Sequence, residues 1–179
     1  MRLTMTLALS TGLMIAAGPA TAQQPASPPP ACTSEQHRAF DFWIGEWEAY
    51  VTGTDQLAGL STIKAEDGGC VITEHWRSQR ASYSGRSLNI YDAIAGRWEQ
   101  FWVDSTGDLT HFIGNPTATG MQLTAEDDHS PGQSGAYLSR MTFTRNDDGS
   151  VRQHGQISTD RGATWSDRYD FTYTPAKTP

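Results

Sequence analysis

From residue 46 to residue 174, apolar and polar residues alternate in short segments, and turns rich in Gly, Asp, Asn and Pro separate them. Alternation with a period of two is typical of β-strands whose two faces meet different surroundings. The connections are too short for helices that would cross between parallel strands, so consecutive strands should be antiparallel neighbours. We predict about ten strands, at residues 46–52, 57–66, 70–79, 86–93, 97–104, 109–114, 121–126, 136–145, 150–158 and 164–174.

An antiparallel sheet of this size either closes on itself or folds into two layers. Closure removes exposed edges, so we expect an all-β fold, an antiparallel up-and-down β-barrel of about ten strands. The alternative is a β-sandwich, because the same ten segments could form the strands of either fold. Ahead of the strands, Ser34 can cap a short helix through Phe42. We expect Phe40, Phe42 and Trp43 to close one end of the barrel.

The N-terminus has the form of a secretory signal peptide. Arg2 provides a positive charge, residues 7–17 are mainly apolar, and Ala20-Thr21-Ala22 is a small-residue cleavage site, so the mature chain should begin at Gln23. The apolar run is interrupted by Thr and Ser and is shorter than the roughly 20 residues that a membrane span requires. We therefore expect a soluble protein, periplasmic or secreted, with no membrane span.

Cleavage leaves 157 residues, which suits one domain. The formal net charge of the whole chain is −7, whereas nucleic acids and anionic membranes select for clustered Lys and Arg. We expect a small-molecule ligand and no nucleic-acid partner, and the oligomeric state stays open. The predicted organisation is a signal peptide at 1–22, a Pro-rich leader at 23–33, the barrel domain at 34–175 and a tail at 176–179.

Cys32 and Cys70 are the two cysteines of this chain. In an exported protein they most simply form a disulfide, with a reactive thiol as the alternative. Their separation of 38 residues corresponds to a loop-entropy contribution of roughly 4 kcal/mol. No Cys or His lies two to four residues from either cysteine, so we predict no metal site there.

Alternation divides each strand into two faces without showing which face points inward. Several strands carry Trp and Tyr alternating with amides and carboxylates, a mixture typical of ligand cavities. A water-filled lumen or a solvent-facing surface is the alternative. The predicted cavity lining is Glu74, Trp76, Asn89, Tyr91, Trp98, Gln100, Trp102, Arg140 and His154.

The stretch Phe40-Asp41-Phe42-Trp43-Ile44-Gly45-Glu46-Trp47-Glu48 is followed by aromatic-rich stretches at 69–76, 87–92 and 98–104. On these residues the chain resembles a family of exported bacterial proteins of unknown function, similar to lipocalin, fatty-acid-binding and nitrobindin-type barrels. In such barrels a Gly-x-Trp opens the first strand, here Gly45-Glu46-Trp47. The resemblance spans residues 32–173 and implies the barrel fold without identifying an activity.

A haem cofactor, as in nitrobindins, does not follow from this resemblance. The axial histidine of those proteins has no assigned counterpart here, and the cofactor stays unknown. The histidines available are His37, His75, His111, His129 and His154.

A second resemblance is local. Ser158-Thr159-Asp160-Arg161-Gly162-Ala163-Thr164-Trp165 matches the Asp-box found on hairpin turns of sialidase-like propellers. In those proteins the Asp and Ser bond the turn backbone, and the Gly takes a positive φ. We predict a structural hairpin turn here, because a propeller would need several repeated blades.

Motifs for established chemistry are absent from the sequence. It contains no Gly-x-Ser-x-Gly elbow, phosphate-binding loop, dinucleotide fingerprint or His-Glu-x-x-His. We therefore predict an exported binding protein that holds a partly apolar small molecule in an aromatic and polar cavity. The alternative is a barrel enzyme, a hydrolase or an isomerase, in which Glu74 and His154 transfer protons.

Overall fold

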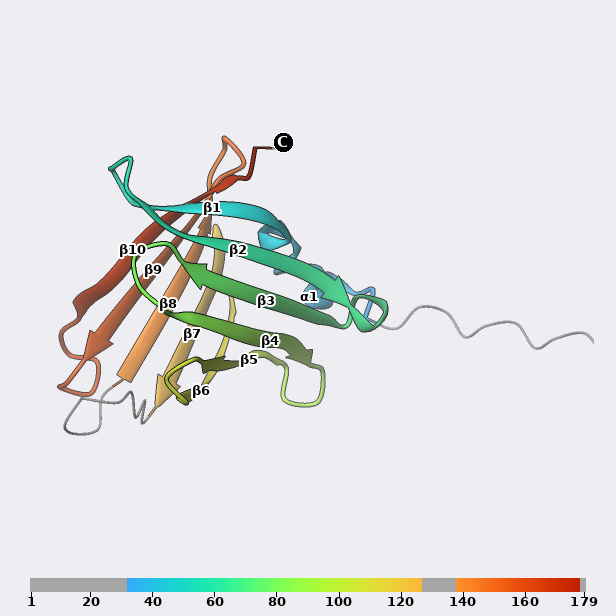
Figure 1. Ribbon diagram of the computed structural model, residues 1–179. Helices are drawn as coiled ribbons and strands as arrows, with labels where there is room; N and C mark the ends of the chain where they lie inside the picture. The colour runs from blue at the N-terminus through green and yellow to red at the C-terminus, as the bar shows by residue number, and fades with distance from the viewer. Residues whose placement is uncertain (1–31, 127–137, 178–179) are drawn as a thin grey trace, which may run out of the picture.

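The chain forms one closed antiparallel β-barrel (Figure 1). The computed structural model describes residues 32–126 and 138–177, so the predicted signal peptide and most of the predicted leader lie outside it. The strands are β1 (Gly45–Val51), β2 (Leu57–Glu66), β3 (Val71–Ser78), β4 (Ser84–Asp92), β5 (Arg97–Asp104), β6 (Leu109–Pro116), β7 (Gly120–Glu126), β8 (Leu138–Arg145), β9 (Val151–Ser158) and β10 (Ser166–Pro175).

Each strand pairs with its neighbours in sequence, and β1 also pairs with β10. In this closing pair Trp47 lies opposite Pro175, and Val51 lies opposite Phe171. The up-and-down barrel is therefore confirmed and the sandwich alternative is wrong. The strand bounds differ from the predicted ones by at most two residues, and the start of the predicted strand 136–145 lies outside the described residues.

Successive strands reverse direction, so their connections lie alternately at the two ends of the barrel. One end, here named the closed end, carries α1 (Glu35–Arg38) and the 3₁₀ helix η1 (Asp41–Trp43). The Cys32–Cys70 disulfide, as predicted, joins the segment before α1 to the β2–β3 connection, which contains a second 3₁₀ helix, η2 (Asp67–Gly69). The turns after β1, β3, β5 and β9 lie at the opposite end, named the open end (Figure 1).

The predicted helix cap is confirmed. The Ser34 Oγ accepts a hydrogen bond from the backbone N–H of His37 at 3.4 Å, which satisfies a donor that the helix leaves unpaired. The helix is shorter than predicted, because α1 ends at Arg38 and the chain resumes as η1.

Aromatic packing closes this end. Phe40 and Trp43 are fully buried, and their rings stack with 5.1 Å between centroids. Phe40 also meets the ring of Phe143 edge-on at 5.0 Å. The indole N–H of Trp47 donates to the carbonyl of Trp43 at 2.9 Å. Phe42 joins this group at its margin, where it is half-buried and its ring lies 5.6 Å from that of Phe40, between centroids.

The predicted Asp-box turn between β9 and β10 is confirmed. The Asp160 carboxylate accepts from the backbone N–H of Thr164 at 2.8 Å and from the hydroxyls of Ser158 and Thr164 at 2.7 and 2.6 Å. Gly162 takes a φ of 88°, a conformation that L side chains rarely adopt. The turn is therefore held by the side chains of its own sequence.

Candidate functional site

The open end of the barrel leads into a cavity of about 430 Å³, a volume typical of small-molecule sites. Its lining follows the inward-facing positions of the strands, so it can be described from the floor to the rim. The floor consists of Glu74, Gln100, Phe112, Met141, Gln153 and Tyr173. The wall consists of Ala58, Trp76, Trp102, Thr110, Tyr169 and Phe171. The rim consists of Ser78, Arg80, Tyr83, Asp104, Asp108 and Arg168.

Glu74 is the charged residue of the floor. Its side chain is reached from both neighbouring strands, because Ser61 on β2 donates to Oε1 at 3.0 Å and Ser87 on β4 donates to Oε2 at 3.2 Å. Only 5% of the residue is exposed. Burial raises the pKa of Glu74 to about 7, although the two serine hydroxyls oppose this shift. Near neutral pH this carboxyl group is therefore divided between its neutral and charged forms.

A chain of polar side chains continues from Glu74 towards the closed end. Ser87 accepts from the amide of Asn89 at 2.9 Å, and Asn89 accepts from the amide of Gln100 at 2.7 Å. The Asn89 amide also donates to the backbone carbonyl of Ile72 at 2.9 Å. Buried amides of this kind are rigid when they are fully paired. Because the Ser87 oxygen accepts from Asn89, its hydroxyl hydrogen is directed at Glu74.

Tyr173 and Gln153 form the opposite part of the floor. The Tyr173 hydroxyl donates to the Gln153 Oε1 at 2.6 Å, and the Gln153 amide donates to the Met141 sulfur at 3.4 Å. Burial raises the pKa of Tyr173 well above its usual value, and the nearby Glu74 charge adds to this shift. Tyr173 therefore remains a neutral phenol throughout the physiological range.

Aromatic rings form most of the wall. Phe171 stacks against Trp76 with 5.5 Å between centroids, and it also stacks against Tyr169 at 5.3 Å. Trp102 completes the wall on the β5 side. Such rings offer a large apolar area together with electron-rich faces.

Three glycines make room for these rings. A Cβ atom added at Gly59 would lie 2.4 Å from the Trp76 ring, and one added at Gly85 would lie 2.1 Å from the Trp102 ring. The third case is Gly155, where the added Cβ would lie 2.3 Å from the Tyr169 ring. Glycine inside a strand often marks such a close approach. The three rings can occupy these positions because the glycines beside them carry no side chain.

The rim carries charges of both signs. Asp104 accepts from the Tyr83 hydroxyl at 3.0 Å and from the Trp102 indole at 3.4 Å. Burial alone would raise the pKa of Asp104. The hydrogen bonds from Thr106, Tyr83 and Trp102 outweigh this effect, so the pKa lies below its usual value. Asp104 therefore stays ionised near neutral pH. Asp108 and the guanidinium groups of Arg80 and Arg168 complete the charged rim.

Seven of the nine predicted lining residues face the barrel interior. Four of them, Glu74, Trp76, Gln100 and Trp102, line the cavity itself. Asn89 and Trp98 are buried below it, on the side of the closed end, where the Trp98 indole donates to the Gln36 carbonyl at 3.0 Å. Tyr91 lies there too, half-buried beside Trp98 with 6.2 Å between ring centroids.

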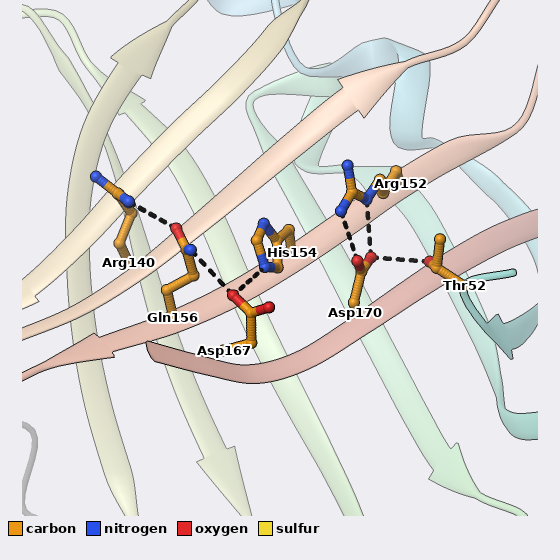
Figure 2. Close-up of polar contacts among 7 residues, drawn as sticks. All are labelled: Thr52, Arg140, Arg152, His154, Gln156, Asp167 and Asp170. Carbon is orange, nitrogen blue, oxygen red and sulfur yellow. Dashed lines mark hydrogen bonds and ion pairs between the residues drawn. The ribbon is translucent and has the colours of Figure 1, made fainter. Parts of the chain in front are cut away.

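Arg140 and His154 are corrections, because both lie on the outer face (Figure 2). Arg140 is next to the buried Met141 on β8, so the alternation of the strand turns its side chain outward. There it donates to Gln156 at 2.6 Å and lies over the ring of Trp165, 3.9 Å from its centroid. His154 contacts Asp167 at 2.8 Å. Neither side chain reaches Glu74.

The same outer surface contains a second polar contact, between Arg152 and Asp170 (Figure 2). The Asp170 carboxylate also accepts from the hydroxyl of Thr52 at 2.8 Å. Thr52 directly follows β1, so this group of residues ties β9 and β10 to β1 where the barrel closes. Its position indicates a structural role.

The sequence-based prediction missed all of the cavity lining that β8, β9 and β10 contribute. Tyr169, Phe171 and Tyr173 alternate along β10, which is a readable period-two pattern. The strand glycines Gly59, Gly85 and Gly155 were a further signal, since each marks a ring that approaches the backbone. Gln153 had no comparable signal.

A metal ion or a haem iron in the cavity would require ligating side chains in its lining. Among the described residues, no group of three or more His, Cys, Asp and Glu side chains is arranged to hold a metal ion. None of the histidines in residues 32–126 and 138–177 lines the cavity, and His129 lies outside these ranges. In the same part of the chain, no helix combines the length and apolarity needed to cross a membrane.

Comparison with known proteins adds no assignment. No protein-family model matches this chain, and no curated protein matches it. The structure contributes the closed antiparallel barrel, with its aromatic cluster beside α1 and a cavity at the open end. Function must therefore be inferred from the side chains of that cavity.

Proposed function

We propose that this chain is an exported binding protein whose barrel holds a small, partly apolar molecule in the cavity at its open end. The observation that carries this proposal is the contrast within the cavity, an aromatic wall of Trp76, Trp102 and Phe171 above a hydrogen-bonded floor around Glu74. Apolar walls provide contact area, and a few fixed polar groups provide orientation, as in most ligand pockets. The floor residues Gln100 and Gln153 would assist Glu74 in orienting the ligand.

The barrel fold is also compatible with the lipocalin- and nitrobindin-type resemblance, which we retain as part of this proposal. Export to the periplasm or the medium belongs to it as well. It is supported by the signal-peptide pattern of residues 1–22 and by the Cys32–Cys70 disulfide, a bond typical of oxidising compartments. The proposed binding domain spans residues 34–175.

The enzyme alternative loses its main support. It requires Glu74 and His154 to exchange protons with one substrate, yet His154 lies on the outer face with Asp167 as its partner. Among the residues that the structure describes, the hydrogen-bond partners of Glu74 are the hydroxyls of Ser61 and Ser87. A general acid without a second catalytic group favours binding over turnover.

The proposal can be tested with N-phenyl-1-naphthylamine, an apolar dye that fluoresces when it leaves water. We expect a saturable increase in fluorescence with one dye per chain. The variant Ala58→Phe places a ring in the cavity lining and should weaken dye binding at least about tenfold, because the added side chain occupies ligand volume.

The matched control is Leu60→Phe. Leu60 lies on the same strand but pairs with the exposed Arg77, so its side chain belongs to the outer face. This variant should bind the dye as the wild type does. Non-saturable dye binding, or equal affinity in a folded Ala58→Phe variant, would refute the proposed site.

A further inference from the structure

The carboxyl group of Glu74 lies in the cavity floor without a cationic partner. None of the ion pairs among the described residues includes it. The cations of the cavity lining, Arg80 and Arg168, belong to the rim. Glu74 is four residues below Ser78, the last residue of β3, which corresponds to a depth of roughly 13 Å along the strand. The arginines of the rim therefore do not neutralise the floor.

The hydrogen bonds of Glu74 leave acceptor capacity for a ligand. An ionised carboxylate can accept about four hydrogen bonds. Ser61 and Ser87 supply one each, and the neighbouring hydroxyl of Tyr173 is committed to Gln153. An ionised carboxylate in this position is costly unless a positive group pairs with it. A ligand that brings a cation removes that cost.

The wall above Glu74 suits the same kind of ligand. The rings of Trp76, Phe171 and Trp102 surround the space between the rim and the floor. Aromatic faces attract cations, and groups of such rings are a known way to bind ammonium groups. None of the wall residues carries a positive charge. The cavity thus combines electron-rich aromatic walls with a carboxyl group in its floor.

We propose that the cavity selects a small amine, whose ammonium group pairs with Glu74 and whose apolar body lies between Trp76, Phe171 and Trp102. This inference rests on the proposed binding function and specifies the class of ligand. The ammonium group donates to the carboxylate oxygens that Ser61 and Ser87 leave available. A neutral alcohol of the same shape makes the apolar contacts without the ionic one.

The ionisation of Glu74 makes the inference sensitive to pH. Its raised pKa of about 7 means that pairing with an ammonium group releases a proton from the fraction of molecules that are neutral. Tyr173 faces Glu74 and remains neutral, because burial and the Glu74 charge raise its pKa well above its usual value. The other charged groups of the lining, Arg80, Arg168, Asp104 and Asp108, belong to the rim, and hydrogen bonds hold the pKa of Asp104 below its usual value. The affinity for an amine should therefore rise between about pH 6 and pH 8.

The test compares 2-phenylethylamine with 2-phenylethanol, a neutral molecule of similar shape, by calorimetric titration of the intact oxidised protein. At pH 8 the amine should bind at least about tenfold more tightly than the alcohol. The amine should lose about tenfold in affinity between pH 8 and pH 6, because the ionised fraction of Glu74 falls by that factor. The affinity for the alcohol should not change.

The variant Glu74→Gln should abolish both the preference for the amine and its pH dependence. The matched control Glu66→Gln removes the same charge from an exposed position and should preserve both. Equal affinities for amine and alcohol in the wild type would overturn the inference without any variant, and so would tighter amine binding at pH 6. Saturable dye binding alongside either result would show that the binding function stands and only the ligand class is wrong.

Discussion

Glu74 shows at the scale of one residue how a binding group affects stability. Its pKa is about 7 in the folded protein, against 4.5 for an ordinary glutamate, so the folded state holds its proton more tightly than the unfolded state does. The stabilisation from this neutral form is complete below about pH 4.5 and is lost as the pH rises through 7.

We predict that the free energy of unfolding of the wild type falls by about 2 kcal/mol more than that of Glu74→Gln between pH 5 and pH 8. Glutamine has a similar shape but does not titrate, so the difference between the two proteins isolates this carboxyl group. Urea unfolding at several pH values measures it. Parallel pH profiles for the two proteins would show that Glu74 titrates normally.

At the scale of the element, the β9–β10 hairpin depends on Asp160. Its hydrogen bonds with Thr164 and Ser158 lower its pKa to about 2, so the turn keeps a charged acceptor over the whole physiological range. The turn lies at the open end, and β10 carries Tyr169 and Phe171 into the cavity wall. Order in this turn therefore supports the binding site.

We predict that Asp160→Ala increases amide hydrogen exchange at Thr164 and Gly162. The Thr164 N–H loses its acceptor directly. The Gly162 N–H donates to the Ser158 hydroxyl, which loses the carboxylate that orients it. Exchange in β3 should stay slow, since the disulfide and the barrel pairing hold that strand independently. Hydrogen exchange followed by NMR measures both regions. Unchanged protection at Gly162 and Thr164 would show that the backbone alone determines the turn.

At the scale of the whole molecule, one disulfide fastens the closed end. Cys32 precedes the helix that covers this end, and Cys70 follows η2. The bond therefore keeps the aromatic side chains Phe40 and Trp43 in place over the strands. Its presence also fits the proposed export.

We predict that protein recovered from the periplasm begins at Gln23 and carries the Cys32–Cys70 bond. Replacing both cysteines by serine should lower the free energy of unfolding by about 4 kcal/mol, the loop-entropy value for a closed loop of 38 residues. Intact mass determines the start and the oxidation state, and urea unfolding determines the loss. A chain that still begins at Met1 and contains free thiols would contradict the proposed export.

Local signals were enough for much of the fold. Period-two alternation located the strands, because the pleat of a strand places successive side chains on opposite faces. Short turns required antiparallel neighbours, and the pattern from Ser158 to Trp165 identified its hairpin. The disulfide was predictable because the sequence contains two cysteines and a signal-peptide pattern. Each of these inferences uses residues that are close in sequence or few in number.

The site depended on longer-range geometry. Glu74 meets Ser61 and Ser87, each 13 residues away, only because the register of β2, β3 and β4 brings them to one level. The same geometry turns Arg140 and His154 outward, although both strands contain mixed side chains. Alternation defines two faces for a strand, but the inward face is chosen by how the whole ring packs. That packing leaves Glu74 facing an aromatic cavity without a cation beside it.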